Sequence, residues 1–146
     1  MRRIAQLLTL LGLILAGLRA EIPRIRVEPL WFRSQVTHTT MPPALPELAL
    51  ASRLVRIILE VEVDSAGVVN HVSVLDEGDA SVAALIQSAV KTWRFQPIRS
   101  VLRGINEGVR IGRLIFYAKE TGGSTILVDA AAERLAEERK KRAALK

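Results

Sequence analysis

The clearest pattern in the chain is a run of alternating apolar and polar residues that repeats after a short turn. Between Val55 and Asp64 the two kinds of residue alternate, which is typical of a half-buried β-strand. Asp64-Ser65-Ala66-Gly67 has the chemistry of a turn, because glycine tolerates a positive φ, and Val68–Leu75 is a second strand-like stretch. The two stretches predict a β-hairpin.

A helix is predicted after the hairpin, and a third strand after the helix. Apolar residues between Val82 and Trp93 recur every three or four positions, and Asp79 or Ser81 can cap this helix. We expect it to pack across the sheet through Leu85, Ile86, Ala89 and Trp93. The third strand is predicted over Val109–Tyr117, and its inward register is ambiguous: Val109, Ile111, Ile115 and Tyr117 compete with Leu114 and Phe116.

The first 20 residues have the pattern of an export signal. Met1-Arg2-Arg3 precedes the largely apolar stretch Ile4–Leu18, and the small residue Ala20 comes just before a change to polar and proline-containing sequence. The apolar stretch is short for a membrane-spanning helix, which needs about 20 residues. Residues 1–20 are therefore predicted to be a signal peptide, with an uncleaved anchor as the alternative, and the protein is expected in the periplasm.

Proline and charge define the segments on either side of the domain. Five of the six prolines lie between Pro23 and Pro46, so residues 21–41 are predicted to be an extended linker. Trp31 and Phe32 within it either fold back onto the domain or form a docking site. A short helix is expected over Leu45–Arg53.

The C-terminal residues 121–146 are predicted to form a flexible link followed by a basic helical tail. The helix from Asp129 has an acidic start and a basic end, which suits the helix dipole. Together these elements predict an α+β domain over residues 42–120. Its sheet is expected to be three-stranded and largely antiparallel, with one main helix packed on one face.

Composition excludes several classes of function. The net charge is +6, but Glu21–Glu120 holds twelve basic and eleven acidic residues, so no nucleic-acid partner is expected. There are no cysteines, and the two histidines, His38 and His71, lack partners at metal-ligand spacing, so no metal or other cofactor is expected. The sequence assembles no nucleophile with a base and an orienting group, and we predict that the protein is not an enzyme.

The order of the motifs resembles the C-terminal domain of the TonB family. Val61-Glu62-Val63-Asp64-Ser65-Ala66-Gly67-Val68 precedes a helix that ends in Trp93-Arg94-Phe95-Gln96-Pro97. The resemblance covers Pro42 to Lys119 and implies a periplasmic module in transport across the outer membrane, which binds an extended receptor peptide beside its last strand. The peptide-binding residues that it implies are Val109, Arg110, Ile111, Gly112, Arg113, Leu114, Ile115, Phe116 and Tyr117.

The chain also departs from the family in ways that leave alternatives open. Its apolar stretch has no histidine, whereas the family's anchor uses a Ser/His pair to engage a proton-driven motor, and the basic tail is an addition. Arg110 and Arg113 are expected either to guard a solvent-facing strand edge or to contact an acidic peptide. The alternative function is a structural subunit of an envelope assembly that uses the tail helix or the edge strand, and a free edge would also permit a homodimer.

Overall fold

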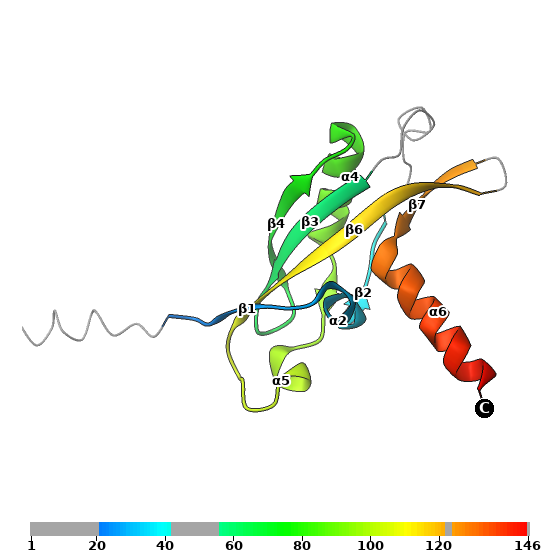
Figure 1. The fold of residues 1–146 in the computed structure, drawn as a ribbon. Helices are drawn as coiled ribbons and strands as arrows, with labels where there is room; N and C mark the ends of the chain where they lie inside the picture. The colour runs from blue at the N-terminus through cyan, green and yellow to red at the C-terminus, as the bar shows by residue number, and fades with distance from the viewer. Residues whose placement is uncertain (1–20, 42–55, 122–123, 146) are drawn as a thin grey trace, which may run out of the picture.

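The computed structural model describes residues 21–41, 56–121 and 124–145, and its centre is a mixed five-stranded sheet (Figure 1). The strand order is β1-β6-β3-β4, and β7 pairs with the far end of β6. All these pairs are antiparallel except β1 with β6, which is parallel. The strands are β1 (Arg24–Arg26), β3 (Arg56–Val63), β4 (Val69–Asp76), β6 (Val109–Thr121) and β7 (Ser124–Asp129).

Four helices and a small second sheet complete the described part of the chain. The second sheet pairs β2 (Val36–His38) with β5 (Arg94–Phe95) in antiparallel orientation. The helices are α2 (Pro29–Ser34), α4 (Ala80–Val90), α5 (Ile98–Val101) and α6 (Ala130–Ala144). The predicted α+β class is confirmed, whereas the predicted count of three strands is wrong, because β1 and β7 extend the sheet.

The predicted hairpin is β3 and β4, joined by the turn at Asp64. The carboxylate of Asp64 accepts hydrogen bonds from the backbone N–H groups of Ala66 and Val68, each at 2.9 Å. Gly67 completes the turn with φ at +90°, a conformation that a side chain would disfavour. Local chemistry therefore fixes this turn, as the sequence predicts.

Helix α4 packs on one face of the sheet and encloses the core. Asp79 caps it by accepting from the N–H groups of Ser81 and Val82, which confirms one of the two predicted caps. Leu85 was expected to face the sheet but is 37% exposed, so that prediction is wrong. The buried helix residues are Val82, Ala83, Ile86 and Val90. They belong to one core with alternate residues of β3 and with Trp93.

Residues 21–41 are not an extended linker, because most of them fold onto the domain. Pro29 stands in the first turn of α2, where its missing N–H costs nothing, and Glu28 caps this helix. Phe32 is fully buried, with its ring 4.7 Å from that of Phe95. The alternative in which Phe32 folds back is therefore the correct one. Trp31 on the same helix is 37% exposed.

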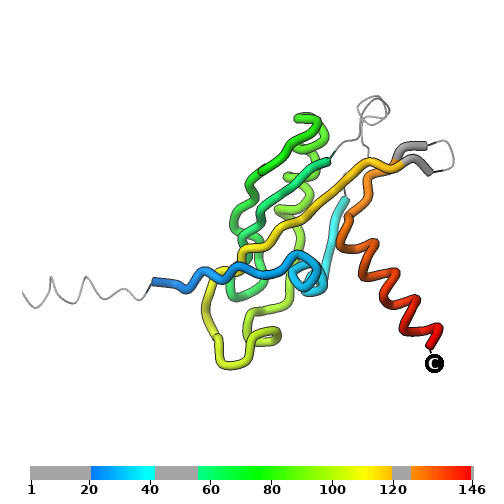
Figure 2. The backbone as a smooth tube through the Cα atoms, in the orientation of Figure 1, coloured from blue at the N-terminus to red at the C-terminus, as the bar shows by residue number. Residues whose placement is uncertain are grey.

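The C-terminal segment forms a second hairpin and then a helix. Strand β6 continues to Thr121 and pairs with β7, so Thr121, Ser124 and Thr125 of the predicted flexible link are strand residues, whereas residues 122–123 lie outside the described residues. Leu114 and Phe116 are fully buried, which resolves the register of β6. The predicted tail helix is confirmed as α6, which descends from β7 beside α2 (Figure 2). The expected export segment 1–20 and the helix over 45–53 lie outside the described residues.

Candidate functional site

The nine β6 residues that were expected to bind a peptide divide between the two faces of the sheet. The residues that face α4 and the core are Arg110, Gly112, Leu114 and Phe116, all of them buried. The alternate residues face away from α4, on what we call the open face: Val109, Ile111, Arg113, Ile115 and Tyr117.

The edge of β6 that faces away from β3 carries segments of the chain itself. Strand β1 pairs with Val109–Ile111, and β7 pairs with β6 from Phe116 onward. The N–H of Val109 donates to Pro23 O at 2.8 Å, and the N–H of Val27 donates to Ile111 O at 3.0 Å. Between these pairings α2 lies beside β6. The start of the edge is thus already occupied by an added strand.

Two ion pairs tie β1 to β3 across the intervening β6. Arg26 Nη1 lies 2.9 Å from Glu60 Oε2, and Arg24 pairs with Glu62 in the same way. The arginine side chains are 59% and 69% exposed, but those of the two glutamates only 20% and 21%. Ile111, which lies between Arg26 of β1 and Glu62 of β3, is 5% exposed although it lies on the open face. The two carboxylates therefore form a sheltered pair on β3 that receives cations from β1, on the other side of β6.

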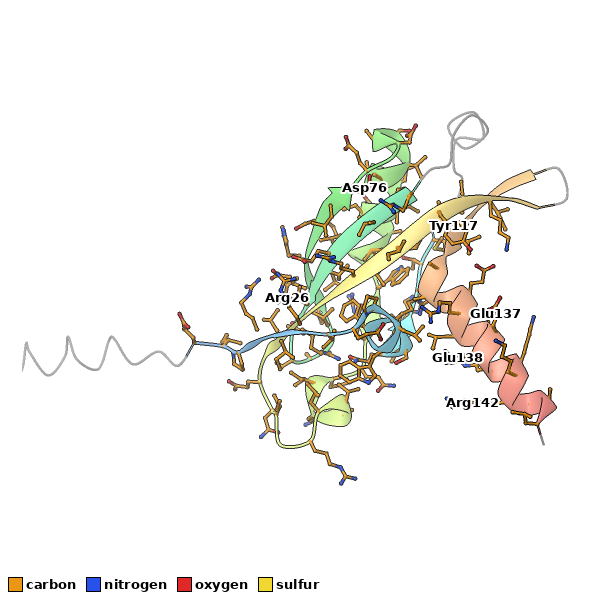
Figure 3. The ribbon with its side chains drawn as sticks, in the orientation of Figure 1. Arg26, Asp76, Tyr117, Glu137, Glu138 and Arg142 are labelled. Carbon is orange, nitrogen blue, oxygen red and sulfur yellow. The ribbon has the colours of Figure 1, made fainter. Side chains whose placement is uncertain are left out.

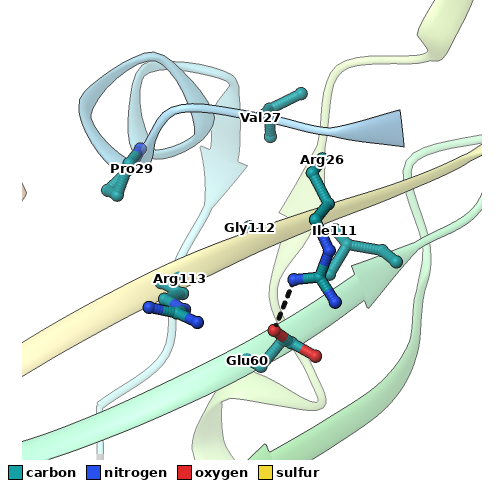
Figure 4. A pocket seen from close by; sticks show the side chains of 7 residues that line it. All are labelled: Arg26, Val27, Pro29, Glu60, Ile111, Gly112 and Arg113. Atoms are coloured by element: carbon teal, nitrogen blue, oxygen red, sulfur yellow. Dashed lines mark hydrogen bonds and ion pairs between the residues drawn. The ribbon is translucent and has the colours of Figure 1, made fainter. Parts of the chain in front are cut away.

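A hollow lies beside these ion pairs (Figure 4). Its walls come from the N-terminal segment, β3 and β6, and the residues that line it are Arg26, Val27, Pro29, Glu60, Ile111, Gly112 and Arg113. Arg113 is exposed and makes no ion pair with any other described residue. Gly112 is required here, since a Cβ atom would lie 2.1 Å from Phe32 Cγ. The hollow thus borders the point where β1 leaves the edge.

Arg110 is not solvent-facing, and the expectation that it guards the edge or contacts a peptide is wrong. Its side chain is fully buried, and burial lowers the pKa of the guanidinium. It donates to Gln96 O at 2.6 Å and to the side-chain oxygen of Gln35. Arg110 therefore joins β6, on the inner side of the sheet, to two segments that precede it in the chain.

The far end of β6, where Figure 3 labels Tyr117, is tied to the start of α6 by hydrogen bonds. The hydroxyl of Tyr117 and the ammonium of Lys119 both donate to the carboxylate of Glu133. These bonds lower the pKa of Glu133, and the bond that Tyr117 donates to this carboxylate raises the pKa of the phenol. On α2, Arg33 pairs with Asp129, the N-cap of α6. The helix is thus fixed at its first turn.

We expect the pKa of Tyr117 to lie above its usual value of about 10 and to fall back toward that value in Glu133→Gln. The carboxylate favours the neutral phenol, and the amide removes its charge. Tyr117 is the single tyrosine of the chain, so the ultraviolet absorbance of its phenolate measures this pKa directly. Glu138→Gln on the same helix is the control. An unchanged pKa in Glu133→Gln would contradict the contact.

At the opposite side of the sheet, the outer strand β4 has no strand on its free side among the described residues. Two features limit pairing there. Gln87 of α4 donates its side-chain amide to Val72 O at 2.8 Å, and the pairing of β4 with β3 is irregular near both ends. Side chains on the edge and bulges both disfavour the addition of another strand. The edge of β6, which already accepts one, is the better candidate site.

Sequence reasoning named β6 but missed the groups that face its edge from other strands. Arg24 and Arg26 were assigned to a linker, and Glu60 and Glu62 were treated only as the polar positions of a strand. One signal was present: each pair is spaced by two residues, which places both members on one face of a strand. Their meeting across β6 depends on a parallel pairing between segments more than 80 residues apart.

Comparisons with protein-family models, curated proteins and solved structures find no match to this chain. Within the described ranges, no helix is long and apolar enough to cross a membrane. The same ranges contain no cluster of three or more His, Asp or Glu side chains that could hold a metal ion. The candidate site therefore rests on its geometry: a strand edge, an added strand and two sheltered carboxylates.

Proposed function

We propose that this protein is an exported, TonB-like protein-binding module of the Gram-negative envelope, which receives an extended segment of a partner protein at the β6 edge. One observation carries the proposal: β6 holds an extended segment, β1, as an added parallel strand. Strand addition uses backbone hydrogen bonds for affinity and side-chain contacts for specificity. The partner segment would take the place of β1 on Val109–Ile111.

Strand β1 is suited to exchange because it is short and weakly held. It spans three residues, and each backbone hydrogen bond contributes a net of about 1 kcal/mol. Its ion pairs are largely exposed on the arginine side, where such pairs contribute at most about 1 kcal/mol. Glu28, which caps α2, follows β1 after a single residue. Strand β1 can therefore leave while α2 stays anchored by Phe32.

The resemblance to the TonB family supports the class of partner. The motif residues of the turn and of Trp93–Pro97 occur in the family's order, and the predicted export signal precedes them. A peptide of an outer-membrane receptor, delivered in transport, is the partner that this resemblance implies. A subunit of an envelope assembly is the alternative partner.

A disulfide that locks β1 in place tests the proposal. Arg24 and Val109 are neighbours across the parallel pair, and the chain has no other cysteine. We expect a photo-crosslinking residue at position 113 to capture an envelope protein, identified by mass spectrometry, in cells expressing either single variant, Arg24→Cys or Val109→Cys. Capture of that protein should be lost in the double variant once its disulfide forms.

Two results would overturn the proposal. One is capture that persists in the disulfide-locked double variant, because the edge would then not be the binding site. The other is capture only from a matched probe at Asn70 on β4, which would place binding at the other edge of the sheet. A further outcome is capture of a second copy of this chain at position 113, which would show that the β6 edge is a contact between two copies of the protein and not a site for a partner protein.

A further inference from the structure

We infer that the segment received at the β6 edge is basic, with two Lys or Arg residues separated by one apolar residue, and that Glu60 and Glu62 recognise it. The inference rests on the proposed function, because it names the chemistry of the partner at that site. The present occupant, β1, has the sequence Arg24-Ile25-Arg26 and shows what the edge accepts.

The two carboxylates take their ion-pair partners from the added strand. With β1 in place their side chains are four-fifths sheltered, and removing β1 removes the ion-pair partner of each. The side chains that remain opposite them are His71 beside Glu62 and Arg113 beside Glu60. A partly buried carboxylate without a cation is costly, so an apolar or acidic segment would bind less well than a basic one.

The geometry also sets the spacing and length of the basic side chains. Arg24 stands beside Val109 but pairs with Glu62, which lies opposite Ile111. Each arginine thus reaches across β6 and two residues along it, a distance that suits the long side chains of Arg and Lys. Alternation places both cations on the open face and turns the residue between them toward the core side, where Ile25 is half-buried.

A partner protein fits this edge better than β1 of a second copy. Only Val27 and Glu28 separate β1 from α2, and α2 is held by the buried ring of Phe32. Two extended residues span about 7 Å. An exchanged β1 would therefore bring its own body directly against the acceptor, whereas a flexible partner segment has no such restriction.

The test uses the full chain and labelled synthetic peptides in a fluorescence anisotropy titration. The basic probe has the sequence Ile22–Val27 of this chain, and the control peptides carry Glu or Val in place of both arginines. The charge reversals Arg24→Glu and Arg26→Glu together open the edge, because they set four carboxylates against one another. The matched control reverses two other exposed arginines, Arg99 and Arg103.

We expect the basic peptide to bind the opened variant about ten-fold more tightly than the wild-type chain or the control variant. In the wild type, β1 competes in cis, which lowers the apparent affinity by the fraction of time that the edge is free. Adding Glu60→Gln and Glu62→Gln to the opened variant should weaken binding of the basic peptide about ten-fold but leave binding of the Val-substituted peptide unchanged, because renewed closure by β1 would weaken both. The Glu-substituted peptide should not bind the opened variant. Far-ultraviolet circular dichroism checks that each variant is folded.

The outcomes separate this inference from the proposed function. Equal binding of the basic and Val-substituted peptides would overturn the recognition of charge while leaving strand addition intact. Binding that is unchanged by Glu60→Gln and Glu62→Gln would do the same. If none of the peptides binds the folded, opened variant, strand addition at this edge is refuted, and the inference falls with it.

Discussion

Replacing Arg110 with alanine is expected to lower the free energy of unfolding by about 3 kcal/mol. The fully buried guanidinium donates to Gln96 O and to Gln35, which is itself 2% exposed. Alanine leaves both acceptors without this donor and opens a cavity, and we expect the two effects together to cost about 3 kcal/mol. Urea unfolding followed by tryptophan fluorescence measures the change, since Trp93 is buried in the same core.

Arg113→Ala is the matched control for this prediction. It removes an arginine from the same strand, three residues further on, but one that is exposed and forms no ion pair in the described chain. Its effect should stay within about 0.5 kcal/mol. If both substitutions change the unfolding free energy equally little, Arg110 does not join β6 to its neighbours. If Arg110→Met restores the free energy of unfolding to that of the wild type, the loss in Arg110→Ala comes from packing alone and not from the hydrogen bonds of the guanidinium.

The contrast between these two arginines shows where sequence reasoning ended. Arginine is rarely buried, so two arginines on one predicted strand were both expected to face solvent. The burial of Arg110 depends on Gln35, which is 75 positions away in the chain. The spacing of three residues between the two arginines places them on opposite faces of a strand, but no local pattern identifies Gln35 as the partner of the inner arginine.

Elements with a local cause were predicted correctly. The β3–β4 hairpin follows from alternation and from the Asp64 turn, and α4 follows from its apolar spacing and its Asp79 cap. The tail helix α6 likewise follows from its own residues and the Asp129 cap. In each case residues close in sequence supply the cap, the turn or the periodicity.

Elements that depend on distant partners were missed. Strand β1 is too short to show a period and is defined only by its pairing with β6. Helix α2 was missed because the prolines of this segment were taken as the mark of an extended linker. Pro29 in fact stands in the first turn of α2, where a helix tolerates proline. Glu60 and Glu62 can be recognised as ion-pair partners of Arg26 and Arg24 only once β1 is known to pair with β6. The strand that holds the candidate site was thus predictable, but the segment that occupies it was not.

Gly67, in the turn of the first hairpin, is expected to be the backbone position most sensitive to substitution. Gly67→Ala should lower the free energy of unfolding by about 3 to 4 kcal/mol. The residue has φ at +90°, and a Cβ atom would lie 2.0 Å from Phe95 O. Its own carbonyl accepts from the N–H of Phe95 at 2.9 Å. The side chain would therefore force the turn away from β5 and break this bond.

Gly104→Ala separates the two causes. Gly104 also has a positive φ, +79°, but a Cβ atom there would have no neighbour within 4 Å, so the variant reports backbone strain alone, about 1 kcal/mol. The amount by which Gly67→Ala lowers the free energy of unfolding beyond Gly104→Ala measures the docking of the turn on β5. The same urea unfolding experiment measures both variants. Equal effects would contradict that docking. A large excess would mean that the contact between the Asp64–Gly67 turn and the Trp93–Pro97 segment stabilises the fold. These two segments carry the family resemblance, so their order in the sequence would then be evidence for a fold first and for a binding partner only second.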